Sequence, residues 1–155
     1  MRLFVALELD DLARKRLADY QHRLQSLDRA VRWVNPEQIH LTLKFLGEVP
    51  DRQIPELAQA VDSLATQPAF EFVMESVGYF GSPRSPRVIW AGVRMPNPAL
   101  TALQKASETA ISPLGYPPED RAYSPHLTLG RVKDFRAGQT VAAAVDQLKR
   151  KLVTP

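Results

Sequence analysis

His40-Leu41-Thr42-Leu43 and His126-Leu127-Thr128-Leu129 are two copies of one tetrapeptide in a chain of 155 residues. Each copy lies in an apolar run with the length and composition of a β-strand. Successive side chains of a strand point to opposite faces, so the histidine and threonine of each copy share one face while the leucines enter the other. The repeat therefore predicts two strands that present two imidazoles and two hydroxyls to one cleft.

The polar groups of the repeat fit acid–base catalysis. Imidazole gains and loses its proton near neutral pH, so His40 and His126 can supply a general base and a general acid for one displacement. The hydroxyls of Thr42 and Thr128 are neutral donors suited to an anionic oxygen. A lone histidine or threonine in an amphipathic strand is more often structural, but the repetition in matching contexts favours catalytic roles.

Composition narrows the class of protein. With 45% hydrophobic and 24% charged residues, the chain is expected to fold as a soluble globule of one domain or two joined lobes. It has no cysteine, which excludes disulfides, thiolate zinc sites and a cysteine nucleophile. No apolar run approaches the ~20 residues that span a bilayer, and the start lacks the features of a signal peptide, so we expect no membrane association and a cytoplasmic location. The net charge of +3 is only a weak indication of a polyanionic partner.

Apolar patterns along the whole chain predict an α+β fold. Strands are expected at Arg2–Glu8, Val31–Val34, Ile39–Leu46, Phe70–Phe80, Arg87–Val93 and Pro125–Val132. Helices are expected after a cap at Asp10 or Asp11, from Asp51 to the residue before Pro68, over Pro98–Leu114, and from a cap at Thr140 to Leu152. The segment Gly81–Pro86 is interpreted as a loop too long for a tight hairpin turn, and Trp90 as a core residue. Because the second half repeats the order of the first, we expect an internal duplication with the two copies facing each other.

Four segments resemble the 2H phosphoesterase superfamily, which is named for its two H-x-T-x motifs. They are residues 2–7, 40–49, 88–93 and 125–131, in that order along nearly the whole chain. Within the superfamily, the match is closest to the RNA 2′,3′-cyclic phosphodiesterases of bacteria and archaea, also called the 2′-5′ RNA ligase family. One H-x-T-x motif would be a weak signal, whereas two with matching flanks are a strong one.

The resemblance implies a LigT-like fold and a set of site residues. The fold would be a single bilobal domain over residues 1–155, with pseudo-twofold duplicated antiparallel sheets, outer helices and a central cleft. By position, the resemblance implies catalytic roles for His40 and His126, phosphate binding by Thr42, Thr128 and Arg131, and contacts near the nucleoside for Phe4, Phe45 and Tyr123. It also implies a reaction that needs no metal and no cofactor.

The implied reaction opens the 2′,3′-cyclic phosphate at an RNA end to a 2′-phosphate. In our working hypothesis, His126 activates water and cationic His40 protonates the departing 3′-oxygen, while the threonines and Arg131 bind the charged oxygens. The reverse reaction, 2′-5′ ligation of RNA ends, would use the same groups. The expected partners are RNA with cyclic phosphate ends or small cyclic nucleotides.

Three alternatives stay open. A 2H phosphodiesterase could act on another small cyclic nucleotide or an ADP-ribose-type cyclic phosphate, because only the pocket would differ. A non-catalytic module could bind RNA or nucleotides with the same cleft. A metalloenzyme is disfavoured, since each motif offers threonine and leucine where metal ligands would be needed.

The chain departs from the family pattern after its last helix. Members of this branch usually continue with further strands, whereas this sequence ends at Pro155. Either one lobe is built with fewer strands or the sequence is clipped, and we expect an exposed sheet edge there.

Overall fold

The computed structural model describes residues 1–153, which form two compact units. Each unit is assembled from three separate segments of the chain. The first unit contains Met1–Leu7, Thr42–Phe72 and Arg94–Pro125, and the second contains Glu8–Leu41, Val73–Val93 and the chain from His126 onward. Each combines one β-sheet with helices, so the predicted α+β class is confirmed.

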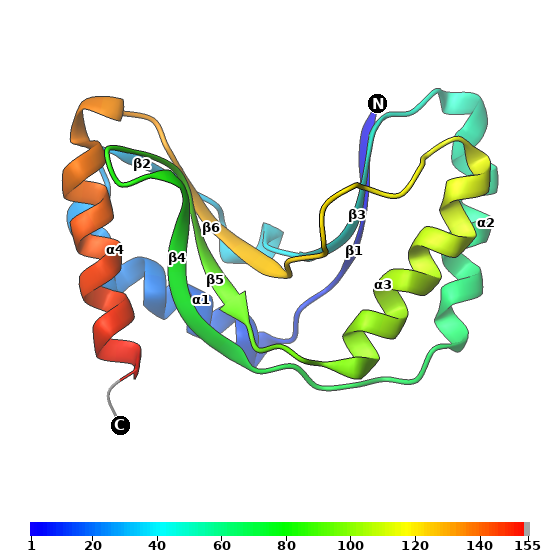
Figure 1. The fold of residues 1–155 in the computed structure, drawn as a ribbon, viewed down its shortest axis with the longest axis horizontal. Helices are drawn as coiled ribbons and strands as arrows, with labels where there is room; N and C mark the ends of the chain where they lie inside the picture. Colours follow the sequence, from blue (N-terminus) through cyan, green and yellow to red (C-terminus); the bar gives the residue numbers. More distant parts are fainter. Residues whose placement is uncertain (154–155) are drawn as a thin grey trace. The chain divides into compact units, whose positions relative to one another are not determined.

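The first unit is built on a two-stranded sheet. Strand β1 (Arg2–Leu7) pairs with β3 (Leu41–Glu48), which carries the threonine of the first motif. Helices α2 (Ile54–Asp62) and α3 (Pro98–Ile111) pack against each other, as Figure 1 shows. Asn97 begins α3 by accepting a hydrogen bond from the backbone N–H of Leu100, with proline at the first helical position. The core of this unit is formed by Val5, Leu43, Val49, Leu57, Leu100, Leu103 and Ile111.

The second unit is built on a four-stranded antiparallel sheet in the order β2-β6-β5-β4. These strands are Val31–Trp33, His126–Val132, Ser85–Val93 and Met74–Ser82. Helix α4 (Gly138–Val153) runs along one face of the sheet against β4 and β5 (Figure 1). Helix α1 (Asp11–Arg23) completes the unit, and its cap is Asp10, which accepts from the N–H of Ala13 at 2.8 Å. Most of the buried apolar residues of the protein belong to this unit, among them Leu17, Val77, Ile89, Ala91, Leu127, Leu129, Val141 and Val145.

The remaining turns contain short 3₁₀ segments. They are Gln25–Leu27, Pro36–Gln38, Asp51–Gln53, Ser63–Thr66, Ser112–Leu114 and Phe135–Ala137. The predicted second helix thus divides into α2 and a 3₁₀ turn at each of its ends, and the predicted third helix ends in a 3₁₀ turn after α3. Such turns are common at helix ends, where the last intrahelical hydrogen bonds tighten.

Strands β4 and β5 meet in a tight hairpin, so the predicted long loop is wrong. Gly81 pairs with Pro86 and Ser82 with Ser85, which leaves two residues in the turn. Gly81 has φ of +105°, and a side chain there would collide with the carbonyl oxygen of Ser85. Pro86 is tolerated because the pairing is irregular beside it. Glycine and proline in this segment therefore mark a bulged hairpin and not a loop, and β4 begins at Met74, four residues later than predicted.

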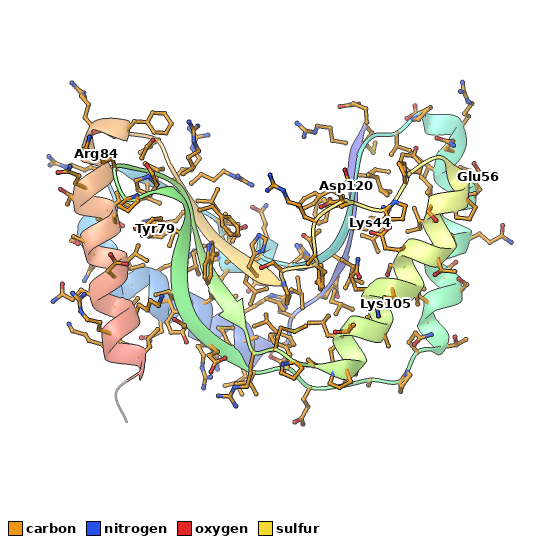
Figure 2. The ribbon with its side chains drawn as sticks, in the orientation of Figure 1. Lys44, Glu56, Tyr79, Arg84, Lys105 and Asp120 are labelled. Atoms are coloured by element: carbon orange, nitrogen blue, oxygen red, sulfur yellow. The ribbon has the colours of Figure 1, made fainter. Side chains whose placement is uncertain are left out.

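The last helix also begins earlier than the sequence predicts. Asp134 accepts from the N–H of Arg136 and starts a 3₁₀ turn that leads into α4 at Gly138, so Thr140 lies inside the helix and does not cap it. A side chain at position 138 would collide with the carbonyl oxygen of Arg84. Figure 2 shows Arg84 at the tip of the β4–β5 hairpin beside this helix start. The glycine lets the hairpin backbone approach α4, a tertiary contact that the sequence pattern does not show.

Membrane-spanning helices and groups of metal ligands are both absent from the described residues. Among the helices of residues 1–153, none is long and apolar enough to cross a membrane. Within the same part of the chain, no three His, Asp or Glu side chains form a group that could hold a metal ion. The sequence predicts that strands found in other family members after the last helix are absent here. The end of the chain, Thr154 and Pro155, lies outside the described residues.

Candidate active site

Both motif segments show the alternation that the repeat predicts. Along residues 39–43 and 126–129, every leucine and isoleucine is at most 4% exposed, whereas every histidine and threonine is half-buried. The buried side chains belong to the cores described above. The imidazole and the hydroxyl of each motif therefore share the face of the strand that points away from the core.

The two motif histidines belong to the same compact unit. His40 lies in the segment Glu8–Leu41 of the second unit, directly before β3, and His126 is the first residue of β6. The Nδ1 atom of His40 lies 2.9 Å from the carbonyl oxygen of Gln38. A carbonyl can only accept, so this contact assigns the proton to Nδ1 and leaves the lone pair of the neutral ring on Nε2.

An aromatic pair supports the imidazole of His126. The Phe80 ring of β4 meets the His126 ring edge to face, with 4.9 Å between centroids and an interplanar angle of 89°. Phe80 also packs at 5.6 Å against Trp90 of β5. Phe80 was not among the predicted site residues, because a phenylalanine near a strand end carries no local mark of such a contact.

Trp90 lies on the motif face of the sheet and not in the core. It stands opposite Thr128 in the register of β5 and β6, and its indole covers Gly78, where a side chain would collide with the ring. Its neighbours Ile89 and Ala91 are fully buried, so strand alternation directs the tryptophan to the other face. The prediction of a core role for Trp90 is therefore wrong.

A β-bulge determines where Arg131 points. Thr128 pairs with Trp90, but Gly130 pairs with Ile89, so Leu129 is an extra residue on β6. Strict alternation would place Arg131, three residues after Thr128, on the leucine face. The extra residue shifts the phase, and the exposed side chain of Arg131 shares the face of His126 and Thr128, while Val132 turns into the core.

Gln21 of helix α1 holds this bulge in place. Its Nε2 donates to the carbonyl oxygen of Leu129 at 3.0 Å and to that of Val34 at 2.7 Å. The Leu129 carbonyl also accepts from the N–H of Val34 at 2.9 Å. The carbonyl of the extra residue is thus fully bonded. Sequence reasoning did not find Gln21, since a polar residue in an amphipathic helix is normally solvated.

The other three predicted residues lie in the first unit. Phe4 and Phe45 are 51% and 60% exposed, and their rings lie 6.3 Å apart at 48°, so they form an exposed aromatic pair. Tyr123 is half-buried and donates its hydroxyl to the carbonyl oxygen of Thr42 at 2.8 Å. Burial raises the pKa of Tyr123 to about 12. Tyr123 therefore anchors the backbone of the first motif.

A buried ion pair anchors the same strand. Lys44 is 3% exposed, and its Nζ donates to Oε2 of Glu108 at 2.7 Å and to the carbonyl oxygen of Pro117 at 3.1 Å. Figure 2 shows this side chain between β3 and α3. The contacts tie β3 to the helix and to the segment that leads to Tyr123. A lysine in the middle of an apolar strand was a signal for such a pair, although the sequence did not name the partner.

Comparison with known proteins identifies the family. The chain matches the family described as LigT like Phosphoesterase over residues 7–90 and 93–154, and it belongs to this family. The RNA 2′,3′-cyclic phosphodiesterase of Methanothermobacter thermautotrophicus is 36% identical over 150 residues, which cover 96% of this chain and 80% of the relative. The protein of the same name from Archaeoglobus fulgidus is 38% identical over 133 residues, covering 86% and 73%. The crystal structure of TT0787 of Thermus thermophilus superimposes with a TM-score of 0.75 at 31% identity and covers 86% of this chain and 75% of the other. The predicted membership and fold class are confirmed.

Proposed function

We propose that this protein hydrolyses 2′,3′-cyclic phosphate ends of RNA to 2′-phosphates, with His40 and His126 as its acid–base pair. The observation that carries the proposal is the intact repeat of His-x-Thr-x, with the same alternation of buried and half-buried side chains in both copies. The relatives named above support the choice of substrate, because they act on this RNA end by name.

The chemistry follows from the groups available. Water attacks phosphorus opposite the bond to the 3′-oxygen, a base removes the water proton, and an acid gives a proton to the 3′-oxygen as that bond breaks. His126 is the base. His40 is the acid, and because its Nδ1 is bonded to the Gln38 carbonyl, the cationic ring transfers the proton on Nε2. One proton is taken up and one released, so the two imidazoles account for every proton transfer, and the proposed reaction uses no cofactor and no metal.

The charged oxygens of the phosphate require donors that are in place before the reaction. The hydroxyls of Thr42 and Thr128 donate to the non-bridging oxygens, since each shares a strand face with its histidine. Arg131 adds a fixed positive charge on the same face as Thr128. Phe4 and Phe45 offer an exposed aromatic surface to the nucleoside, and Tyr123 positions Thr42 through its backbone carbonyl.

The same groups catalyse the reverse reaction by microscopic reversibility. A 5′-hydroxyl RNA end would take the place of water and form a 2′-5′ linkage. Hydrolysis dominates because water is far more concentrated than any RNA end. We propose a cytoplasmic location, as the sequence predicts.

The test uses an RNA oligonucleotide that ends in a 2′,3′-cyclic phosphate, with and without a chelator. We expect a 2′-phosphate product and equal rates in both conditions. His40→Ala and His126→Ala should each lose about 10²–10⁴-fold in turnover. His22→Ala is the matched control, because this third histidine is exposed on α1. Near wild-type turnover in either motif variant would refute the acid–base pair.

The same assay separates the alternatives. Turnover of small cyclic nucleotides or ADP-ribose-type cyclic phosphates with no turnover of RNA would assign another substrate. Binding of RNA without turnover of any cyclic phosphate would assign a binding module.

A further inference from the structure

Two arginines stand directly opposite each other in the sheet of the second unit. Arg32 of β2 is the register partner of Arg131 of β6, and both are exposed. Directly opposed residues of an antiparallel pair project from the same face. The neighbouring pair, Val31 and Val132, is buried on the other face. Arg32 therefore lies on the motif face, beside Arg131.

Among the described residues, neither guanidinium has an anionic partner. Other arginines of the protein lie near carboxylates, as Arg23 does with Asp19 at 3.9 Å and Arg136 with Asp134 at 3.6 Å. Within residues 1–153, Arg32 and Arg131 make no ion pair and no side-chain hydrogen bond. Like charges directly opposed across two strands repel each other. An anion between them would relieve this repulsion and accept bonds from two planar donors.

The strand register places Arg32 and Arg131 close to Thr128 of the second motif. Thr128 stands opposite Trp90 and Arg131 opposite Val88, two residues further along β5, which corresponds to about 7 Å. Arg32 lies one strand further, about 5 Å across the sheet. Arg131 thus lies between the reacting phosphate proposed above and Arg32, and Arg32 is placed to contact the next anionic group of the same substrate.

We infer that Arg32, together with Arg131, binds the phosphodiester that joins the terminal nucleotide to its 5′ neighbour. Arg32 is then a specificity residue that favours an RNA strand over a mononucleotide. The inference rests on the proposed function, because the motif fixes where the RNA end lies.

The test compares three substrates that share one reacting group. They are cytidine 2′,3′-cyclic phosphate, the dinucleotide ApC with a 2′,3′-cyclic phosphate end, and the same dinucleotide with a neutral methylphosphonate linkage. We expect the wild-type kcat/KM to be highest for the charged dinucleotide. Arg32→Gln should lower that value by about 10–100-fold, to the level of the methylphosphonate, and leave the mononucleotide unchanged. The slope of log kcat/KM against log salt should fall by about 0.7 for the dinucleotide.

The matched control is Arg23→Gln, which removes the same charge from the last turn of α1 and should change none of these values. If Arg32→Gln lowers kcat/KM equally for the dinucleotide and the mononucleotide, or lowers it for neither, the inference is overturned. The proposed function is then left intact. If the wild type turns over no substrate, the proposed function fails on its own. Binding of the dinucleotide product with its 2′-phosphate then decides the role of Arg32, since unchanged affinity in Arg32→Gln refutes it and a loss of about 10–100-fold supports it.

Discussion

Gly130→Ala is the substitution that most directly tests the bulge in β6. A methyl group at this position would lie 2.7 Å from Cγ1 of Val31 and 2.8 Å from Cε3 of Trp33. Carbon atoms in contact prefer about 3.5–4.0 Å, so these neighbours must move by nearly 1 Å. Val31 is 2% exposed, so its side chain is enclosed by other residues. The strain falls at the junction of β2 and β6, where Arg131 faces Arg32.

The cost of this strain follows from similar changes in packed cores. One extra methyl group in a well-packed core costs about 1–3 kcal/mol, and the close contacts at Gly130 with two side chains and the carbonyl oxygen of Arg32 suggest about 2 kcal/mol. For a domain of this size, that loss lowers the melting temperature by roughly 4–8 °C. The assay is thermal unfolding, with urea denaturation as an independent measure. Because both arginines shift, kcat/KM for the charged dinucleotide should fall more than kcat/KM for the mononucleotide.

A double-mutant cycle separates the clash from other effects. Val31→Ala removes one of the atoms that the new methyl group would meet. The double variant Gly130→Ala with Val31→Ala should therefore be less destabilised than the sum of the two single variants, by at least about 0.5 kcal/mol. Additive losses, or a Gly130→Ala protein as stable as the wild type, would show that Val31 and Trp33 do not pack against Gly130 as described.

Three further predictions concern other contacts. Lys44→Met leaves the Glu108 carboxylate without its cation and should lower the free energy of unfolding, measured by urea denaturation, by about 3 kcal/mol. Adding Glu108→Leu should restore much of the lost stability. Equal stability of Lys44→Met and the wild type would refute the ion pair. The pKa of Tyr123 is raised to about 12, so its contribution to stability is complete below pH 10 and is lost as the pH rises from 10 to about 12. The difference in stability between the wild type and Tyr123→Phe should therefore shrink over that range of pH. A constant difference would contradict this prediction. Phe80→Ala should lower kcat/KM by roughly 3–10-fold on every substrate, because the support of His126 is lost, and Phe80→Leu should lose less; a change confined to KM would assign Phe80 to substrate binding instead.

The faces of both motif strands could be predicted from the sequence because they depend on local alternation. The leucines of each His-Leu-Thr-Leu copy determine which side enters the core, and no distant residue is needed to settle the choice. The same reasoning located the cap of α1 at Asp10 within one residue. The α+β class followed from the order of these local patterns.

Features that depend on partners distant in the sequence could not be predicted in this way. The contact between Phe80 and His126 joins the two strands that flank β5, and Gln21 reaches β6 from a helix about a hundred residues earlier in the chain. The hairpin was missed for a different reason. Glycine and proline in Gly81–Pro86 were interpreted as loop residues, whereas pairing with the opposite strand turns the same residues into a bulge.

The bulge in β6 is nevertheless encoded in the spacing of its apolar residues. Leu127 and Leu129 are two positions apart, but the next buried apolar residue, Val132, follows after three. A regular strand could not bury all three side chains on one face, so the sequence requires one extra residue between them. Gly130 lies within that interval, where a side chain would collide with β2. A change of phase in an apolar pattern next to a glycine therefore marks a bulge, and here the change of phase also brings Arg131 to the face of His126. The same bulge thus lets Val132 enter the core with the two leucines and places Arg131 on the face proposed to bind the phosphate.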